Sequence, residues 1–309
     1  MSALSQIAED YLRLRRTLGH KLDEAGRQLP RLVAYLESIG VETITLEAAL
    51  AWAQQPEAGP NTTVWATRMT VARGFARYLA GINPLTQVPP VGMLPHRKHR
   101  RVPFIFSQAD IASLMAQAQQ TIPSPLRAAT LETLLGLLAA TGMRVGEAIR
   151  LNHSDVDWTE GLVMVRASKF GKSREVPLRT STVEALAAYT RRRDRSDLAH
   201  KASSFFVSIV GTRLIYADVR VTFRKLVDTA GIGAGSSVRP RIHDLRHSFA
   251  VHTLVSWYRN GDDVQIYLPR LSTYLGHRDP HSTYWYLSAA PELLALAAGR
   301  LEASAEGRP

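Results

Sequence analysis

Four short segments of the chain contain polar residues whose types suit chemistry on a phosphate ester. Attack on a phosphodiester builds negative charge on its non-bridging oxygens, and two guanidinium groups can bind those oxygens through paired hydrogen bonds. The segments are "ATGMRVGEAIRL" with Arg144, "RASKFGKSREVPL" with Lys169, "RIHDLRHSF" with His243 and Arg246, and "LGHRDPHSTYWY" with His277 and Tyr286. We therefore interpret the two arginines as a candidate phosphate clamp.

The other residue types in these segments supply a nucleophile and proton carriers. A tyrosine phenol, with a pKa of about 10, becomes a good nucleophile only beside positive charge and a proton acceptor. Two histidines can donate and accept protons near neutral pH, and a lysine on a hairpin can protonate a departing sugar oxygen. A phosphotyrosine linkage would conserve the bond energy, so we expect resealing to need no ATP, metal or other cofactor.

Each of these residues also has a purely structural interpretation. Arg144 could pair with Glu147 one helical turn further on. Lys169 could be a solvated turn residue, and His243 could cap a helix. An aromatic triplet such as Tyr284–Tyr286 is usually part of a core. For single residues, both interpretations stay open at this stage.

Two further motifs are incomplete. "FGKS" resembles the end of a phosphate-binding P-loop, but Arg166 stands where that loop needs glycine, and a strand rather than a helix follows. His243 and His247 are spaced to share a metal on one helix face, yet they lack the glutamate of that motif. The chain has no cysteine, which excludes disulfides and thiolate metal sites. An NTPase and a metal centre are therefore disfavoured.

The elements that must position these residues follow from hydrophobic periodicity. Apolar residues at helical spacing predict about four helices in the first 85 residues. They include Ile7, Tyr11, Leu14 and Leu18; Leu29, Leu32, Val33 and Leu36; the segment "TLEAALAWAQQ"; and Trp65, Met69, Ala72, Ala76 and Leu79.

A proline-rich basic segment separates these helices from the rest of the chain. Residues 86–103 contain four prolines and carry a net charge of +4, against +1 for residues 1–85 and +6 for residues 104–309. We interpret residues 86–103 as an extended linker that could lie along a phosphate backbone while two domains grip the duplex. A solvated hinge is the other interpretation. The candidate DNA-binding residues are Arg97, Lys98, Arg100 and Arg101, together with Lys172 and Arg174 of the later hairpin.

The third region, residues 104–309, is predicted to be mainly helical. A leucine-rich helix stops at Gly142, which suits a left-handed C-terminal position. A short helix follows in "VGEAIRL", and "GLVMVRASKFGKSREVPL" predicts a hairpin. Near the end, "PELLALAAGRLEA" carries an apolar stripe at helical spacing, which could pack on its own domain or on a neighbouring subunit. The expected fold class is mainly α with a small β-hairpin or sheet in the second domain (α+β).

The overall composition is that of a globular protein with a polyanionic partner. The net charge is +11, which attracts nucleic acid or an anionic membrane at long range, although charge for solubility alone is the simpler alternative. No apolar run approaches the length needed to span a bilayer, and no signal sequence is evident. We expect a cytoplasmic protein that binds double-stranded DNA and no membrane.

The ordered set of Arg144, Lys169, "HDLRH" and "LGH" with Tyr286 nine residues after His277 resembles the tyrosine recombinase, or phage integrase, family. The resemblance covers nearly all of the chain and implies a helical core-binding domain (1–85), a linker (86–103) and a catalytic domain (104–309) that form a two-domain DNA clamp. It implies that Arg144 and Arg246 bind the scissile phosphate and that Lys169 is the general acid. It also implies that His243 and His277 complete the pocket and that Glu147 supports an arginine.

The resemblance further assigns Tyr286, not Tyr284, as the nucleophile, since the two would point about 200° apart on a helix. It implies a homotetramer on DNA that exchanges strands through 3′-phosphotyrosine intermediates. Whether accessory proteins take part stays open. The segment between Arg246 and His277 is several residues longer than the family usually has. The chain end looks more like recombinases of mobile elements than like chromosome-dimer resolvases. A type IB topoisomerase and a non-cleaving DNA-binding regulator remain the alternatives.

Overall fold

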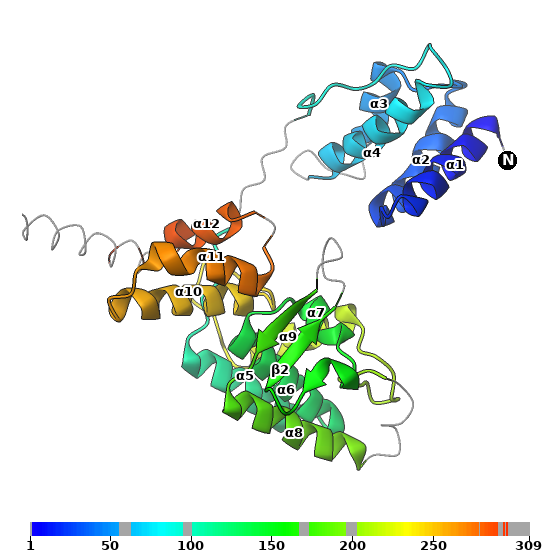
Figure 1. Ribbon diagram of the computed structural model, residues 1–309. Coiled ribbons are helices and arrows are strands. Elements are labelled where there is room, and N and C mark those ends of the chain that lie inside the picture. The colour runs from blue at the N-terminus through cyan, green and yellow to red at the C-terminus, as the bar shows by residue number, and fades with distance from the viewer. Residues whose placement is uncertain are drawn as a thin grey trace, which may run out of the picture. The chain divides into compact units, whose positions relative to one another are not determined.

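The computed structural model describes residues 2–55, 63–94, 101–166, 173–195, 203–277 and 279–289, together with Leu293 and Ala295. The chain divides into two compact units, Met1–Arg100 and Arg101–Pro309. Within the described residues the secondary structure comprises twelve α-helices and one three-stranded antiparallel sheet (Figure 1). The mainly helical fold with a small sheet is therefore confirmed.

The first unit contains the four helices that the periodicity predicts. Two of them begin with a side-chain cap: Ser2 accepts a hydrogen bond from the Ser5 backbone N–H, and Thr45 accepts one from Ala48. Trp52 and Phe75 are fully buried in the core between the helices. The helices are α1 (Ala3–Thr17), α2 (Asp23–Ser38), α3 (Leu46–Ala53) and α4 (Val64–Leu79).

Residues 86–94, which the sequence places in the linker, pack against the first unit. The Gln87 backbone N–H donates to the Ile44 carbonyl at 2.8 Å. Arg73 donates to the carbonyls of Pro89 and Pro90, also at 2.8 Å each, and Leu94 is buried in the same core. The first half of the predicted linker is therefore tied to the helices, and residues 95–100 lie outside the described residues.

The second unit is built around α6, which packs on α5, α8 and α10. The leucine-rich character of α6 follows from this position, because it is covered on most sides and buries residues all around its axis. None of the helices in the described part of the chain has the length and apolar character that crossing a bilayer requires. The helices are α5 (Gln108–Thr121), α6 (Pro125–Thr141), α7 (Val145–Arg150), α8 (Thr180–Asp194), α9 (Tyr216–Thr229), α10 (Asp244–Arg259), α11 (Val264–Leu275) and α12 (His281–Ala289), with a 3₁₀ turn, η2, at His153–Asp155.

The sheet of the second unit has the order β1-β2-β3, with antiparallel neighbours. Its strands are β1 (Val156–Asp157), β2 (Leu162–Val165) and β3 (Arg174–Pro177). The pairing of Val163 with Val176 and of Val165 with Arg174 confirms the predicted hairpin. Residues 167–172, at its turn, lie outside the described residues.

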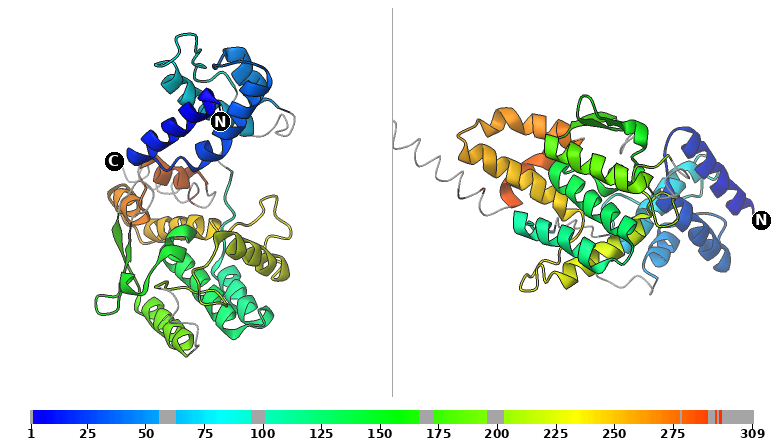
Figure 2. Two further views of the ribbon diagram at one scale, coloured as in Figure 1. Left: turned by 90° about the vertical axis from the view of Figure 1, so that its right-hand side faces the viewer. Right: turned by 90° about the horizontal axis from the view of Figure 1, so that it is seen from below.

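A separate apolar cluster holds α10, α11 and α12 together. It includes Leu254, Leu268, Leu271 and Tyr286, all buried. Figures 1 and 2 show these three helices side by side in views at right angles to each other. The helices that carry the two predicted histidine motifs and the tyrosine therefore share one core.

The predicted helix stop at Gly142 is confirmed. Gly142 has φ of +60°, and its backbone N–H donates to the Leu138 carbonyl at the end of α6. A Cβ atom at this position would lie 2.5 Å from Cδ1 of Phe249 on α10. Only glycine therefore allows both the left-handed backbone and the close approach of α10.

Candidate active site

The two arginines of the predicted clamp lie on different helices and both bind main-chain carbonyls. Arg144 directly precedes α7, and Arg246 is in the first turn of α10. Arg246 donates from Nη1 to the Gly142 carbonyl and from Nη2 to the Leu275 carbonyl, each at 2.8 Å. Arg144 donates from Nη2 to the Gly276 carbonyl at 3.0 Å. The two guanidinium groups therefore meet at the C-terminal end of α11.

Glu147 is a buried carboxylate that binds two arginines. Its side chain accepts from Arg144 Nη1 at 2.7 Å, and from Arg174 Nη1 and Nη2 at 3.3 and 2.8 Å. Burial would raise the pKa of Glu147, but the hydrogen bonds and charge of Arg174, and then those of Arg144, lower it to about 2. The carboxylate is therefore ionised at neutral pH. The Arg144–Glu147 pair, one of the two interpretations open from the sequence, is present.

Arg174 points into the protein, although the sequence suggested a DNA contact. Its side chain is 12% exposed, and besides binding Glu147 it donates from Nε to the Tyr274 carbonyl at 2.8 Å. Its guanidinium also lies 3.0 Å from where a Cβ of Gly276 would be. Since Arg174 begins β3, it connects the strand after the hairpin turn to Glu147 and to the end of α11. This position favours a role in supporting the clamp.

Arg246 is a buried cation whose two hydrogen-bond partners within the described residues are carbonyl groups. It is 2% exposed. Burial, followed by the charge of Arg144, lowers the pKa of Arg246 to about 10, so it remains protonated at neutral pH. A guanidinium has five N–H donors, and carbonyl oxygens do not neutralise its charge. A bound anion with oxygen acceptors would therefore stabilise this site strongly.

The two tyrosines of the "YWY" segment lie on α12 and differ in their exposure to solvent. Tyr286 is 2% exposed, whereas Tyr284 is 48% exposed. The Tyr286 hydroxyl lies 3.0 Å from Nδ1 of His247, the residue after Arg246. Because Tyr286 also packs in the apolar cluster of α10 to α12, it belongs to the core and to the candidate site at once.

The two predicted histidines differ in their contacts. His277 Nδ1 is 2.7 Å from the Thr283 hydroxyl, and its ring stacks at 23° on Tyr286 with centroids 6.2 Å apart. His243 occupies the N-cap position of α10 without a side-chain cap hydrogen bond. The residue borders solvent, and its ring centroid lies 4.9 Å from that of His247. Partial desolvation, and next the charge of His247, lower the pKa of His243 and favour its neutral form.

The longer segment before His277 does not separate that histidine from the site. It forms the last turns of α10, which ends at Arg259, and a turn through Gly261 with φ of +81°. Asp263 then caps α11 by accepting from the backbone N–H groups of Gln265 and Ile266. The extra residues are therefore absorbed at the end of the helix pair remote from Gly276.

The other predicted residues comprise one exposed residue and five that lie outside the described residues. Arg101 is exposed. No cluster of three metal-binding side chains occurs within the described ranges, so His243 and His247 lack a third ligand there. The remaining predicted residues, Lys169, Lys172, Arg97, Lys98 and Arg100, lie outside the described residues.

His247 is the residue that the sequence interpretation missed. We considered it only as half of a metal pair, although its position one turn after His243 and next to Arg246 predicts a place on the same helix face. The ring is held between His243 and Trp285, whose ring centroids lie 4.9 and 5.6 Å away. The i,i+4 spacing of His243 and His247 was therefore the signal in the sequence, but it was interpreted as a possible metal pair.

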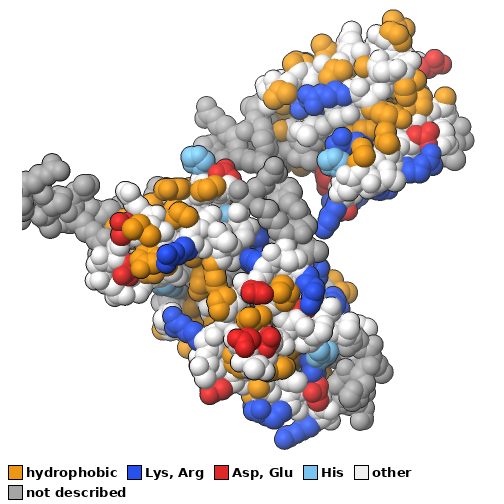
Figure 3. Space-filling view, viewed as in Figure 1, with side chains coloured by type: hydrophobic (Ala, Val, Ile, Leu, Met, Phe, Trp, Pro, Cys, Tyr) orange, Lys and Arg blue, Asp and Glu red, His pale blue; other side chains and the backbone are white. Residues whose placement is uncertain are grey.

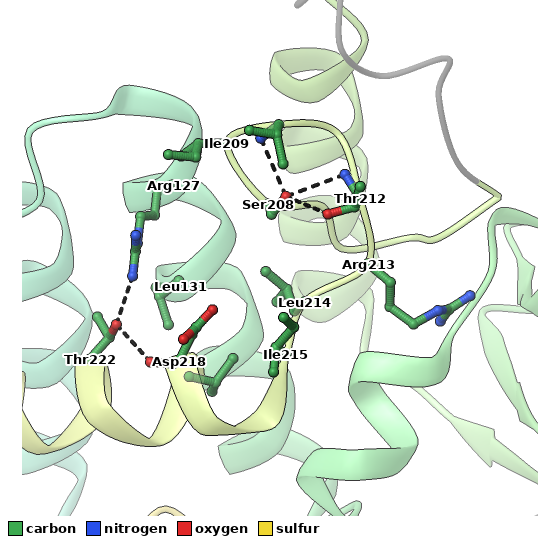
Figure 4. Close-up of a pocket in the computed structure, with 12 residues that line it drawn as sticks. Arg127, Leu131, Ser208, Ile209, Thr212, Arg213, Leu214, Ile215, Asp218 and Thr222 are labelled. Atoms are coloured by element: carbon green, nitrogen blue, oxygen red, sulfur yellow. Dashed lines mark hydrogen bonds between the residues drawn. The ribbon is translucent and has the colours of Figure 1, made fainter.

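A pocket on the described surface lies apart from this cluster. Its lining comes from α6, the 208–215 loop and α9, and includes Leu131, Leu214 and Val219 (Figure 4). Arg127 crosses its edge to donate to the Thr222 hydroxyl at 3.0 Å, and Arg213 points away. None of the predicted site residues lines it. Figure 3 shows basic and acidic side chains mixed on the visible face of the second unit.

Comparison with known proteins gives consistent matches. The model of the phage integrase family matches residues 105–292. A Sinorhizobium fredii protein, named provisionally as integrase/recombinase y4rB, is 43% identical over all of both chains. The tyrosine recombinase XerD of Mycobacterium tuberculosis is 32% identical over 73% of this chain and 70% of its own length. The Tn1549 transposon integrase in complex with transposon right-end DNA has a similar fold, with a TM-score of 0.66, 16% identity and coverage of 97% and 99% of the two chains.

Proposed function

We propose a specific reaction for this chain, which belongs to the phage integrase family and is a tyrosine recombinase, an enzyme that breaks and rejoins DNA. In this proposal it exchanges strands at specific sites of a mobile element through a 3′-phosphotyrosine linkage to Tyr286. One observation carries the proposal. The Tyr286 hydroxyl bonds to the residue next to Arg246, while Arg246 and Arg144 bind adjacent carbonyls at the end of α11.

The charge of the described cluster matches a single phosphodiester. Arg144, Arg174 and Arg246 are cations, Glu147 is the one carboxylate among their contacts, and the lowered pKa of His243 leaves its ring neutral. The cluster therefore carries a net charge of about +2 before a phosphate binds. A phosphodiester brings one negative charge at rest and a second develops in the transition state, so the pocket is best neutralised when the reaction is under way.

Each predicted residue has a role in this reaction. Tyr286 attacks the phosphorus, and Arg144 and Arg246 bind the non-bridging oxygens. Lys169 protonates the 5′ oxygen as it leaves. His243 and His277 complete the pocket by hydrogen bonding to the phosphate, and Glu147 keeps the Arg144 fork oriented.

We propose double-stranded DNA as the partner. The basic residues at 97–101 would follow the phosphate backbone where the chain passes from one unit to the other. For strand exchange we propose a homotetramer that joins two duplexes, and we propose that it acts on DNA in the cytoplasm. The integrase/recombinase name of y4rB supports a recombinase that joins DNA segments. The mobile-element role is our extension from the chain end described above.

Covalent trapping tests the reaction. The full chain is incubated with nicked duplexes drawn from the DNA that flanks its own gene, then denatured, and peptides attached to DNA are identified by mass spectrometry. We expect an adduct on Tyr286 that is lost in Tyr286→Phe and retained in the matched control Tyr284→Phe. An adduct on Tyr284, or none on any flanking duplex despite salt-sensitive binding, would contradict the proposal.

The biological role needs a second assay. A plasmid that carries both flanking segments in direct repeat is incubated with the protein, and the junction of an excised circle is amplified and sequenced. A circle joined within the segments that trap the adduct supports excision. If covalent adducts form but neither excised circles nor inverted segments appear, the strand-exchange role is refuted and DNA relaxation remains as the activity.

A further inference from the structure

We propose that His247 is a catalytic residue: its Nδ1 atom accepts the proton of the Tyr286 hydroxyl during DNA cleavage and returns it during resealing. The inference rests on the proposed function, because it assigns a proton acceptor to the same nucleophile. The sequence offered two other histidines for proton transfer, His243 and His277. The geometry points instead to His247, whose Nδ1 lies against the Tyr286 hydroxyl.

The first observation is the direct contact. Nδ1 of His247 lies 3.0 Å from the Tyr286 hydroxyl oxygen, within the range at which a general base takes up a proton. The neighbouring histidines are placed differently. His277 directs its Nδ1 to the Thr283 hydroxyl at 2.7 Å, and its ring stacks on the face of Tyr286.

The second observation is that the His247 ring is held in place. Trp285 and His243 meet it edge to face, with centroids 5.6 and 4.9 Å away, and the Tyr286 ring lies at 5.5 Å. Its backbone is in the first turns of α10, whose buried residues pack on α6 and α12. A base fixed in this way loses little entropy when the phenol ionises.

The step balances as follows. As the Tyr286 oxygen bonds to phosphorus, its O–H electron pair forms the new O–P bond and the proton moves to the lone pair of His247 Nδ1. The P–O5′ bond breaks, and its electron pair leaves with the 5′ oxygen, which takes a proton from the general acid. In resealing, the 5′ hydroxyl attacks the phosphotyrosine and gives its proton back to the deprotonated general acid. The P–O bond to Tyr286 breaks, and the imidazolium returns its proton to the departing phenolate. The step requires the Nε2–H tautomer of His247 before cleavage.

The charged groups around His247 also favour this transfer. Arg246 precedes it on α10, the His243 ring meets it from the helix start, and Tyr286 contacts it from α12. Arg144 acts on Arg246, and His277 stacks on Tyr286. The arginine charges stabilise a phenolate.

His247→Asn separates the transfer of a proton from the holding of the tyrosine. The asparagine amide reaches the position of Nδ1 and keeps a hydrogen bond, but it cannot accept a proton at these pH values. We expect Tyr286 adduct formation to slow by about 10²- to 10⁴-fold near neutral pH, with unchanged DNA affinity. The rate should then recover as the pH rises toward the phenol pKa of about 10. His281→Asn, at an exposed position of α12, serves as the matched control and should keep the rate and the pH dependence of the wild-type protein.

A second measurement guards against a general structural defect. Fluorinated tyrosine, whose phenol is more acidic, is incorporated at position 286 of His247→Asn. We expect it to restore adduct formation there and to change the wild-type rate little. The proposal is overturned if His247→Asn cleaves at the wild-type rate, or if neither high pH nor the fluorinated tyrosine restores a lost rate. If the wild-type protein itself forms no Tyr286 adduct, the proposed function fails first.

Discussion

Replacing Glu147 by glutamine tests the ion-pair network that supports the clamp. The carboxylate is 3% exposed and binds both Arg144 and Arg174. Its pKa falls from 4.5 to about 2, and a shift of that size corresponds to about 3 kcal/mol of folding free energy. Breaking a buried pair by removing one partner costs about 3–5 kcal/mol by independent reasoning. We therefore expect Glu147→Gln to lower the free energy of unfolding by about 3 kcal/mol.

The pH dependence of that loss has a definite sign. The folded-state pKa of Glu147 is below its unfolded value, so the stabilisation is complete above pH 4.5 and is lost as the pH falls toward 2. The glutamine variant has no such contribution at any pH. The difference in the free energy of unfolding between the two proteins should therefore be constant near neutral pH and should shrink as the pH falls from 4.5 to 2.

Calorimetry of the full chain provides the assay. For a unit of about 200 residues, a loss of this size lowers the unfolding temperature by about 6–12 °C. Only the transition of the second unit should move. Glu175→Gln, an exposed position on β3, is the matched control and should leave both transitions unchanged. A loss below about 1 kcal/mol, or a gap that is as wide near pH 2 as at pH 7, would refute the reasoning.

Two further substitutions and one titration follow from the same contacts. In Arg174→Lys, the lysine cannot reproduce the paired hydrogen bonds of Arg174 to Glu147, so the rate of adduct formation should fall by about 10-fold or more. The slope of log DNA affinity against log salt concentration should stay constant. A slope reduced by about 1 would show that Arg174 contacts a phosphate instead. Gly142→Ala should lower the free energy of unfolding in urea by more than about 2 kcal/mol, because its Cβ would overlap Phe249. Gly231→Ala, also at positive φ but with open space around it, should lower it by only about 1 kcal/mol. Equal losses would contradict the packing argument. DNA affinity should fall at least 10²-fold between 50 and 200 mM salt if several phosphates are neutralised, and a flat dependence would contradict the basic interface.

Local patterns predicted the elements of the fold well where packing agrees with periodicity. The spacing of Met69, Ala72 and Leu79 predicted α4, and all three are buried. The spacing of Leu14 and Leu18 predicted a helix, but 46% of Leu14 and 65% of Leu18 are exposed. Periodicity alone does not show which stripe of a helix meets its neighbours, because that depends on helices far along the chain.

The same limit applies to the site. The residue types of Arg144, Arg246 and Tyr286 are enough to indicate phosphate chemistry. The inward position of Arg174 and the contact of His247 with Tyr286 join residues 27 and 39 positions apart in the chain. Pairings over such separations are set by how β3, α10 and α12 pack, which spacing within a single motif does not encode.

The main-chain carbonyls that bind the two clamp arginines affect which substitutions the site tolerates during evolution. Arg144 and Arg246 take their orientation from the main-chain oxygens of Gly142, Leu275 and Gly276. A main-chain oxygen is present whatever side chain a residue carries, so mutations at neighbouring positions leave these acceptors in place as long as both glycine turns keep their left-handed backbone. Surfaces that read DNA bases can then diversify while the phosphate chemistry is inherited unchanged, which lets descendants of one such enzyme acquire new target sites.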